Sequence, residues 1–150
     1  MGQLEDDNVG RALELKMASR PEDVVLASTA IRAVLALLYD GDTLNQLELA
    51  LVEAINNVIE HAYSGESGHS LSIRLELLHD RVEIKLTDSG HGMNWAKLNR
   101  TKTVLDFDEN DLCTLPEGGL GIAIMQMTMD DVRYERKDGV NQLTLMRYRP

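Results

Sequence analysis

Two neighbouring segments of the chain alternate apolar and polar residues with a strict period of two. Every odd position of residues 71–77 is Leu or Ile, and every even position of residues 82–86 is Val, Ile or Leu. Successive side chains of a strand point to opposite faces, so the pattern predicts two strands with one buried and one polar face. The polar turn at His79, Asp80 and Arg81 makes them an antiparallel hairpin. The rest of the chain must then supply helices that cover its single apolar face.

Two amphipathic helices are predicted before this hairpin. Ser19 to Glu22 forms a capping-box pattern with an early Pro21, and it starts a helix that ends near residues 39–41. Thr43 to Gln46 is a second capping-box pattern, and its helix runs to about Tyr63. Each helix has a core-facing side at helical spacing. The predicted core-facing residues are Val24, Ser28, Ile31, Leu35 and Leu38 in the first helix and Leu47, Leu51, Ile55, Val58 and Ala62 in the second.

The remaining segments complete one predicted domain of residues 11–150. Strands are expected at 13–17, 132–136 and 142–148, the last two around Asp138 and Gly139, and a helix is expected at 121–129. Residues 1–10 are expected to be a loose leader, and residues 93–117, which lack sustained periodicity, a lid. This order predicts an α/β two-layer sandwich, with a mainly antiparallel mixed sheet and the helices on one face.

Charge and composition narrow the classes of partner. The net charge of −10 provides no basic footprint for nucleic acid and disfavours an anionic membrane surface. The longest apolar run, residues 33–39, is too short to span a bilayer. An acidic surface suits a basic protein partner, although solubility alone also explains the charge. The single Cys113 excludes an internal disulfide and fits a cytoplasmic location.

The second helix carries three polar residues beside its apolar stripe. Glu53, Asn57 and His61 are four residues apart, and four residues of an α-helix turn about 400°, so the three share one side. In a cleft at the rim of the core, Glu53 is suited to accept a hydroxyl proton and Asn57 to offer an amide oxygen to Mg²⁺. His61 is better explained as packing or capping the helix end than as a metal ligand. No His or Cys cluster has the spacing of a zinc site.

Two glycine-bearing segments follow. Asp88-Ser89-Gly90-His91-Gly92 directly follows the second hairpin strand, where a carboxylate can accept an amine hydrogen bond and glycines let the backbone approach a flat base. Gly118-Gly119-Leu120-Gly121 opens a helix whose free N–H groups favour phosphate, although no P-loop Lys follows. Each feature alone is common, as a solvated helix face, a turn or a glycine cluster. In this order they together predict a pocket for a magnesium-bound nucleoside triphosphate.

The three segments resemble the N box, G1 box and G2 box of the GHKL ATPase superfamily. The stretches VEAINNVIEHAY, from Val52, and LPEGGLGIAIMQMTMDDVRYERKDG, from Leu115, are most similar to the RsbW/SpoIIAB group of anti-sigma-factor serine kinases. The resemblance covers about residues 11–148. It implies the Bergerat ATPase fold, ATP and Mg²⁺ as cofactors, and usually a homodimer. It also implies a sigma factor as the sequestered partner and a STAS-domain anti-anti-sigma protein as the phosphorylated substrate.

The resemblance also assigns roles to matched positions. Glu53 stands at the general base, Asn57 at the Mg²⁺ ligand, and Asp88 at the residue that binds the adenine amino group. Glycines of the G1 and G2 boxes would shape the base pocket and line the phosphates, and Met93 and Leu120 would lie against the nucleotide. The further nucleotide-binding positions implied are His61, Gly90, Gly92, Met93, Gly118, Gly119, Leu120 and Gly121.

Three functional hypotheses follow from these patterns. The leading one is phosphate transfer from Mg·ATP to a protein hydroxyl, with sequestration of a sigma factor as the output. The alternative is a nucleotide-gated binding module without productive phosphate transfer, against which the presence of Glu53 weighs. A sensor histidine kinase is a more distant option, because no phosphoacceptor hairpin precedes the N box in this sequence.

Overall fold

The computed structural model describes residues 10–93 and 120–150. Several sequence predictions therefore fall outside the described residues. They are the leader up to residue 9, the lid from residue 94, and the glycines Gly118 and Gly119.

A five-stranded sheet forms one layer of the structure. In chain order its strands are β1 (Arg11–Ala18), β2 (Ser70–Leu77), β3 (Arg81–Asp88), β4 (Asp131–Lys137) and β5 (Val140–Tyr148). They lie in the spatial order β1-β2-β3-β5-β4, and each pair of neighbours is antiparallel. The alternation in β2 and β3 therefore predicted the central hairpin correctly. Across the described strands the sheet is antiparallel throughout.

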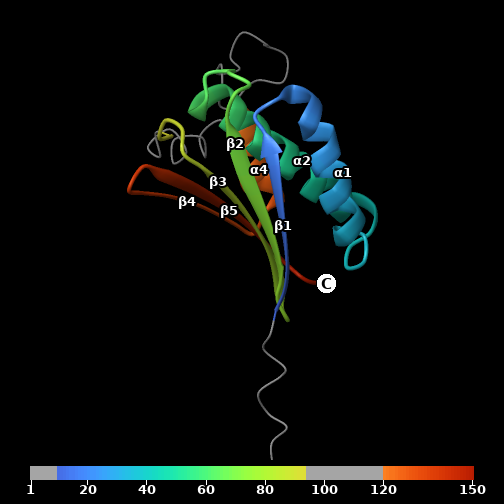
Figure 1. Cartoon of the computed structure of the whole chain (residues 1–150). Helices are drawn as coiled ribbons and strands as arrows, with labels where there is room; N and C mark the ends of the chain where they lie inside the picture. The colour runs from blue at the N-terminus through green and yellow to red at the C-terminus, as the bar shows by residue number, and fades with distance from the viewer. Residues whose placement is uncertain (1–9, 94–119) are drawn as a thin grey trace, which may run out of the picture.

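The helices cover one face of this sheet (Figure 1). They are α1 (Pro21–Leu35), α2 (Gly41–Asn57) with a π-helical extension η1 (Val58–Ala62), and α4 (Leu120–Thr128). This arrangement confirms the predicted two-layer sandwich. No described helix has the length and apolar character needed to cross a membrane.

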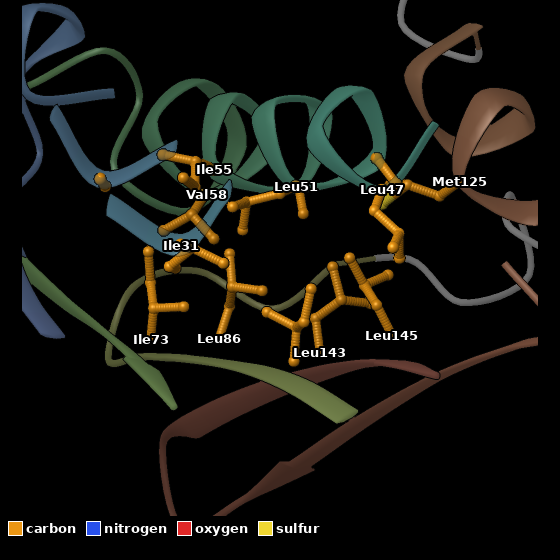
Figure 2. Close-up of a cluster of buried hydrophobic side chains, with 14 of the residues drawn as sticks. Ile31, Leu47, Leu51, Ile55, Val58, Ile73, Leu86, Met125, Leu143 and Leu145 are labelled. Atoms are coloured by element: carbon orange, nitrogen blue, oxygen red, sulfur yellow. The ribbon is translucent and has the colours of Figure 1, made fainter. Parts of the chain in front are cut away.

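The core lies between the helix layer and the sheet. Figure 2 shows Leu47, Leu51 and Ile55 of α2 directed toward the strand residues Ile73, Leu86, Leu143 and Leu145. The five residues predicted to face the core from the second helix are all buried. Of the five predicted in the first helix, Leu38 is only partly buried, because the α-helix ends at Leu35.

Both predicted capping boxes are wrong. The residue before α1 is Arg20, whose side chain does not cap the helix. Ser19 instead donates its hydroxyl to the Glu66 carbonyl at 2.6 Å and accepts the His69 N–H at 3.2 Å. The second helix begins at Gly41, two residues before Thr43, and the side chain of Asp40 makes no capping hydrogen bond. A tertiary partner for Ser19 thus replaced the local bond that the pattern suggested.

The second helix widens at its C-terminal end. The Tyr63 N–H bonds to the Val58 carbonyl at 3.2 Å, five residues back, which is the π-helical pattern. The predicted helical stretch to about Tyr63 is therefore confirmed, but its last part is not α-helical. The four-residue spacing that predicted one shared side ends at Asn57, so His61 is exposed whereas Asn57 is buried. Such wide turns recur at functional sites.

Candidate functional site

Glu53 of α2 lies against the first turn of α4. A methyl group added at Gly121 would lie 2.6 Å from the Glu53 Oε2 atom. Any residue larger than glycine at this position would therefore displace the Glu53 carboxylate. The two residues are 68 positions apart in the sequence (121 − 53). The N-terminal turn of a helix presents free N–H groups and the positive end of the helix dipole. A carboxylate therefore stands beside a helix start that favours an anion.

Asn57 lies one helical turn after Glu53 and is buried. Its side chain is 6% exposed, and its Nδ2 atom has no hydrogen-bond partner among the described residues. A buried amide without a partner costs free energy and calls for an explanation, of which an unseen ligand is one. The site therefore contains a buried amide nitrogen that the described residues around it do not satisfy.

Asp88 ends strand β3 and is also buried. Its Oδ1 atom accepts the Gly90 N–H at 2.9 Å and the Asn141 amide at 2.8 Å. The hydrogen bonds that the described residues make to Asp88 all end on Oδ1. The second carboxylate oxygen is therefore available to accept a hydrogen bond from a ligand.

Asn141 is a site residue that sequence reasoning missed. Register places it directly opposite Asp88 across the β3–β5 pair, and it is 1% exposed. Its amide nitrogen also lies 3.1 Å from the Gly90 carbonyl and 3.2 Å from the His91 carbonyl. A signal was present, because Asn141 is a polar residue at an inward position of a strand whose next inward positions, Leu143 and Leu145, are apolar.

Tyr134 and Arg136 of β4 complete the support of this turn. The Asn141 Oδ1 atom accepts the Tyr134 hydroxyl at 2.9 Å and the Arg136 guanidinium at 2.6 Å. The same guanidinium donates to the Gly90 carbonyl at 3.0 Å, and the Tyr134 hydroxyl accepts the Met93 N–H at 2.7 Å. Side chains of β4 and β5 therefore hold the segment from Asp88 to Met93 at several points. Networks of this kind fix a unique conformation.

The turn after β3 also touches the end of the π-helix. The His91 N–H donates to the Ala62 carbonyl at 2.9 Å. A side chain at Gly90 would overlap the backbone of Ala62, so glycine is required for this close approach. A methyl group at Gly92 would meet only the flexible side chain of Arg136. Glu53 and Ala62 of the α2–η1 segment thus contact the start of α4 and the Asp88 turn, respectively.

A cleft of about 410 Å³ opens beside the Asp88 turn. It is lined by Ala62, Tyr63, Ser64, Glu66, His69, Ser89, Gly90, His91 and Arg136. Tyr63 stacks on His69 with ring centroids 4.4 Å apart, and its hydroxyl accepts the Ser89 N–H at 3.0 Å. Glu53, Asn57 and Asp88 do not line this cleft, which adjoins the candidate site at Ser89, Gly90 and His91.

The structure brings together most of the residues that the sequence singled out. Gly121 of α4 contacts Glu53, and Gly90 after β3 contacts Ala62, so both meet the helical segment that also carries Asn57. His61 is exposed, and none of the described residues forms a hydrogen bond with its ring. Leu120 is the exposed first residue of α4. The described residues contain no group of three or more His, Cys, Asp or Glu that could hold a metal ion.

Comparison with known proteins gives one family. The profile described as the histidine kinase-like ATPase domain matches residues 17–147. The serine-protein kinase RsbW of Bacillus subtilis (strain 168) is 29% identical over 129 residues, which cover 85% of this chain and 80% of the relative. The serine-protein kinase RsbW of Bacillus pumilus is 30% identical over 135 residues, with the same two coverages of 85% and 80%.

A solved structure gives an independent comparison of the fold. The structure of the RsbU and RsbW domains of a Mycobacterium tuberculosis protein superposes with a TM-score of 0.62 and 17% sequence identity. The superposition covers 93% of this chain and 33% of that chain, so this chain spans about a third of the solved one. At this identity the likeness shows a shared fold.

Proposed function

The chain belongs to the histidine kinase-like ATPase domain family, among relatives of the RsbW serine kinases, and from this premise we propose its substrate and partners. It uses Mg·ATP to phosphorylate a Ser or Thr of a STAS-domain anti-anti-sigma protein. It also sequesters a sigma factor. It acts in the cytoplasm as a homodimer.

The observation that carries this proposal is the carboxylate of Glu53 set against Gly121 at the start of α4. Phosphate held at that helix start lies beside a group that can accept a proton. The substrate hydroxyl oxygen attacks the γ-phosphorus, the bond from that phosphorus to the bridging oxygen breaks, and ADP leaves. The hydroxyl proton passes to Glu53. Gly119 and Gly121 line the phosphates.

Asn57 fits a magnesium ligand. Its amide oxygen is a neutral ligand on a buried side chain, and Mg²⁺ bound to phosphates needs few protein ligands. Its amide nitrogen, which has no hydrogen-bond partner among the described residues, can donate to a phosphate oxygen. When bound, the ion neutralises phosphate charge during transfer. The Asn57 amide would hold it one turn from Glu53, so that the metal ligand and the base come from one rigid helix.

Asp88 fits the base-recognising carboxylate. Protein donors occupy its Oδ1 atom, so Oδ2 can accept the adenine amino group without breaking an internal bond. Gly90 and Gly92 shape the base pocket, and the remaining nucleotide contacts are assigned to His61, Met93, Gly118 and Leu120. Selectivity for adenine then rests on a carboxylate that the fold holds in one orientation.

Two substitutions separately test proton acceptance by Glu53 and adenine recognition by Asp88. Glu53→Gln keeps the size of the side chain but removes the proton acceptor. ATP affinity by calorimetry should stay within about threefold of the wild type, whereas phosphate transfer should fall about 100-fold or more. Asp88→Ala should weaken ATP binding itself by about tenfold or more, the loss of a hydrogen bond to a charged group.

The matched control for Glu53 is Glu60→Gln, because Glu60 is exposed on the same helical segment. It should change neither measurement. The readout is the mass of a purified STAS-domain protein, which gains one phosphate. Unchanged transfer by Glu53→Gln would remove Glu53 from the mechanism. Absence of transfer by the wild-type protein, with ATP bound, would favour the nucleotide-gated binding module.

A further inference from the structure

Tyr63 contacts the Asp88 turn from the helix layer. It directly follows η1 and is buried, with 7% of its surface exposed. Its hydroxyl accepts the N–H of Ser89, the residue after Asp88, at 3.0 Å and donates to the Ser70 carbonyl at 2.7 Å. A hydroxyl has a single proton to donate, so the bond to Ser70 leaves its lone pairs to accept from Ser89. The first N–H of the turn is therefore bound by this hydroxyl.

The loop after Tyr63 holds its ring in one orientation. The ring stacks on His69 with centroids 4.4 Å apart and an interplanar angle of 4°. Ser19 fixes this loop, because its hydroxyl donates to the Glu66 carbonyl and accepts the His69 N–H. The His69 Nε2 atom also lies 3.0 Å from the Glu66 carboxylate. The direction of the Tyr63 hydroxyl is therefore set by a stacked ring as well as by its own hydrogen bonds.

The π-helical turn η1 brings Tyr63 to this position. The Tyr63 N–H bonds to the Val58 carbonyl, five residues back, and the Ile59 carbonyl accepts the Gly65 N–H at 2.8 Å. A π-turn contains one residue more than an α-turn, so the side chains after it are rotated by about 100° from their α-helical directions. An α-helical continuation would therefore turn the Tyr63 hydroxyl away from Ser89.

This helix end binds the Asp88 turn at two points. Ser89 donates to the Tyr63 hydroxyl, and His91 donates to the Ala62 carbonyl at 2.9 Å. One contact comes from a side chain and the other from the main chain, and they lie on adjacent residues of the helical segment. The position of the turn relative to the helix layer thus depends on the end of η1.

We propose that Tyr63 is a positioning residue for nucleotide binding. Its hydroxyl holds the start of the turn so that the Oδ2 atom of Asp88 faces the adenine amino group. It also joins the turn to the helical segment that carries Glu53 and Asn57, so that the base-binding and phosphate-binding parts of the site form one unit. This inference rests on the ATP site of the proposed function and adds to it a residue that acts through Asp88.

Tyr63→Phe tests this role, because it removes the hydroxyl and keeps the stacked ring. The ATP dissociation constant, measured by calorimetric titration with Mg·ATP, should rise about fivefold, which corresponds to the loss of one neutral hydrogen bond. Phosphate transfer at saturating Mg·ATP should stay within about twofold of the wild-type rate, because Glu53 keeps its place against Gly121. Hydrogen exchange of the Ser89 amide, followed by NMR, should become faster.

The matched control is Tyr39→Phe. Tyr39 is buried to a similar extent, with 5% exposed, and its hydroxyl donates to the carbonyls of Arg147 and Tyr148 at the end of β5. Loss of this hydroxyl should lower the midpoint of urea unfolding about as much as Tyr63→Phe does, and it should leave ATP affinity unchanged. Equal ATP affinities of the two variants would overturn the positioning role of Tyr63.

A double-variant cycle with Asp88→Ala tests the route of the effect. Because Tyr63 acts through the Asp88 carboxylate, Tyr63→Phe should change ATP affinity less than about 1.5-fold in the Asp88→Ala background. A fivefold loss in both backgrounds, as expected of independent sites, would overturn the inference. Wild-type protein that binds ATP but transfers no phosphate would overturn the kinase role and leave the Tyr63 result standing. Wild-type protein that binds no ATP would overturn both.

Discussion

Asn141 offers a direct test of how the fold prepares the nucleotide site. Its amide is the side-chain group that the described structure places on Asp88, at 2.8 Å, and it also receives the Tyr134 hydroxyl and the Arg136 guanidinium. Asn141→Ala removes these bonds together and leaves the Asp88 carboxylate buried with one fewer donor. We expect a loss of stability and, separately, a loss of ATP affinity.

The size of each loss follows from the contacts. A hydrogen bond to a charged group contributes about 1.5–3 kcal/mol and a neutral one about 1 kcal/mol. Since these bonds share one network, they do not add fully, and we expect about 3–4 kcal/mol in the free energy of unfolding. Loss of the hydrogen bond from Asn141 to Asp88, which orients the Asp88 carboxylate, also weakens ligand binding. A loss of about 1.4 kcal/mol there corresponds to a tenfold weaker ATP affinity.

Urea unfolding measures the free energy of unfolding. Calorimetric titration with Mg·ATP, at a temperature where the variant is folded, measures the ATP affinity. Gln142→Ala is the control, because Gln142 is the next residue of β5 and points to the opposite face. It should change both quantities by less than about 0.5 kcal/mol. A folded Asn141→Ala variant that binds ATP as tightly as the wild type would show that Asn141 supports the fold without positioning Asp88.

Two further predictions concern the same turn and the outer face of the sheet. Gly90→Ala introduces a methyl group that overlaps the Ala62 backbone, so it should cost about 1–3 kcal/mol in the free energy of unfolding, whereas Gly92→Ala meets only a flexible side chain and should cost less. Equal unfolding midpoints for these two variants would contradict the packing argument. The Arg74 hydrogen bond, with Lys85 nearby, lowers the pKa of Glu76 from its ordinary value of 4.5. A lowered carboxyl pKa contributes stability above the unfolded-state value and loses it as the pH falls through the folded-state value. Glu76→Gln should therefore lower the free energy of unfolding by about 0.5–1 kcal/mol at pH 7, and the difference from wild type should disappear in acid. Urea unfolding at both pH values measures this difference. A difference that persists in acid would contradict the prediction.

The fold was predictable where the pattern was local and repeated. Alternation in residues 71–77 and 82–86 located β2 and β3, because successive side chains of a strand point to opposite faces of the sheet. The turn at Asp138 and Gly139 was predictable for a similar reason, since both residues have positive φ, of 54° and 76°, as a two-residue hairpin turn requires. The early proline located the start of α1, which begins at Pro21. The predicted Ser19 cap was wrong, because Ser19 has a partner 47 residues away that competes with the local hydrogen bond.

The candidate site was likewise predictable only where its motifs are local in the sequence. The types and spacing of Glu53, Asn57, Asp88 and Gly121 were enough to single them out, since each motif is contiguous in the sequence. The π-helical end of the second helix was not visible, and it separated His61 from the two residues before it. Asn141, Tyr134 and Arg136 were missed because their roles depend on which strand lies beside β3.

The sequence by itself determined which segments become strands or helices and which polar residues stand out among them, because backbone periodicity and side-chain chemistry act over a few neighbouring residues. Only the tertiary structure decided that Asn141 faces Asp88 across 53 residues of chain, that Glu53 meets Gly121, and that β1 is left as an open edge among the described strands. Those outcomes depend on strand order and register, and these are set by how the whole apolar face is buried.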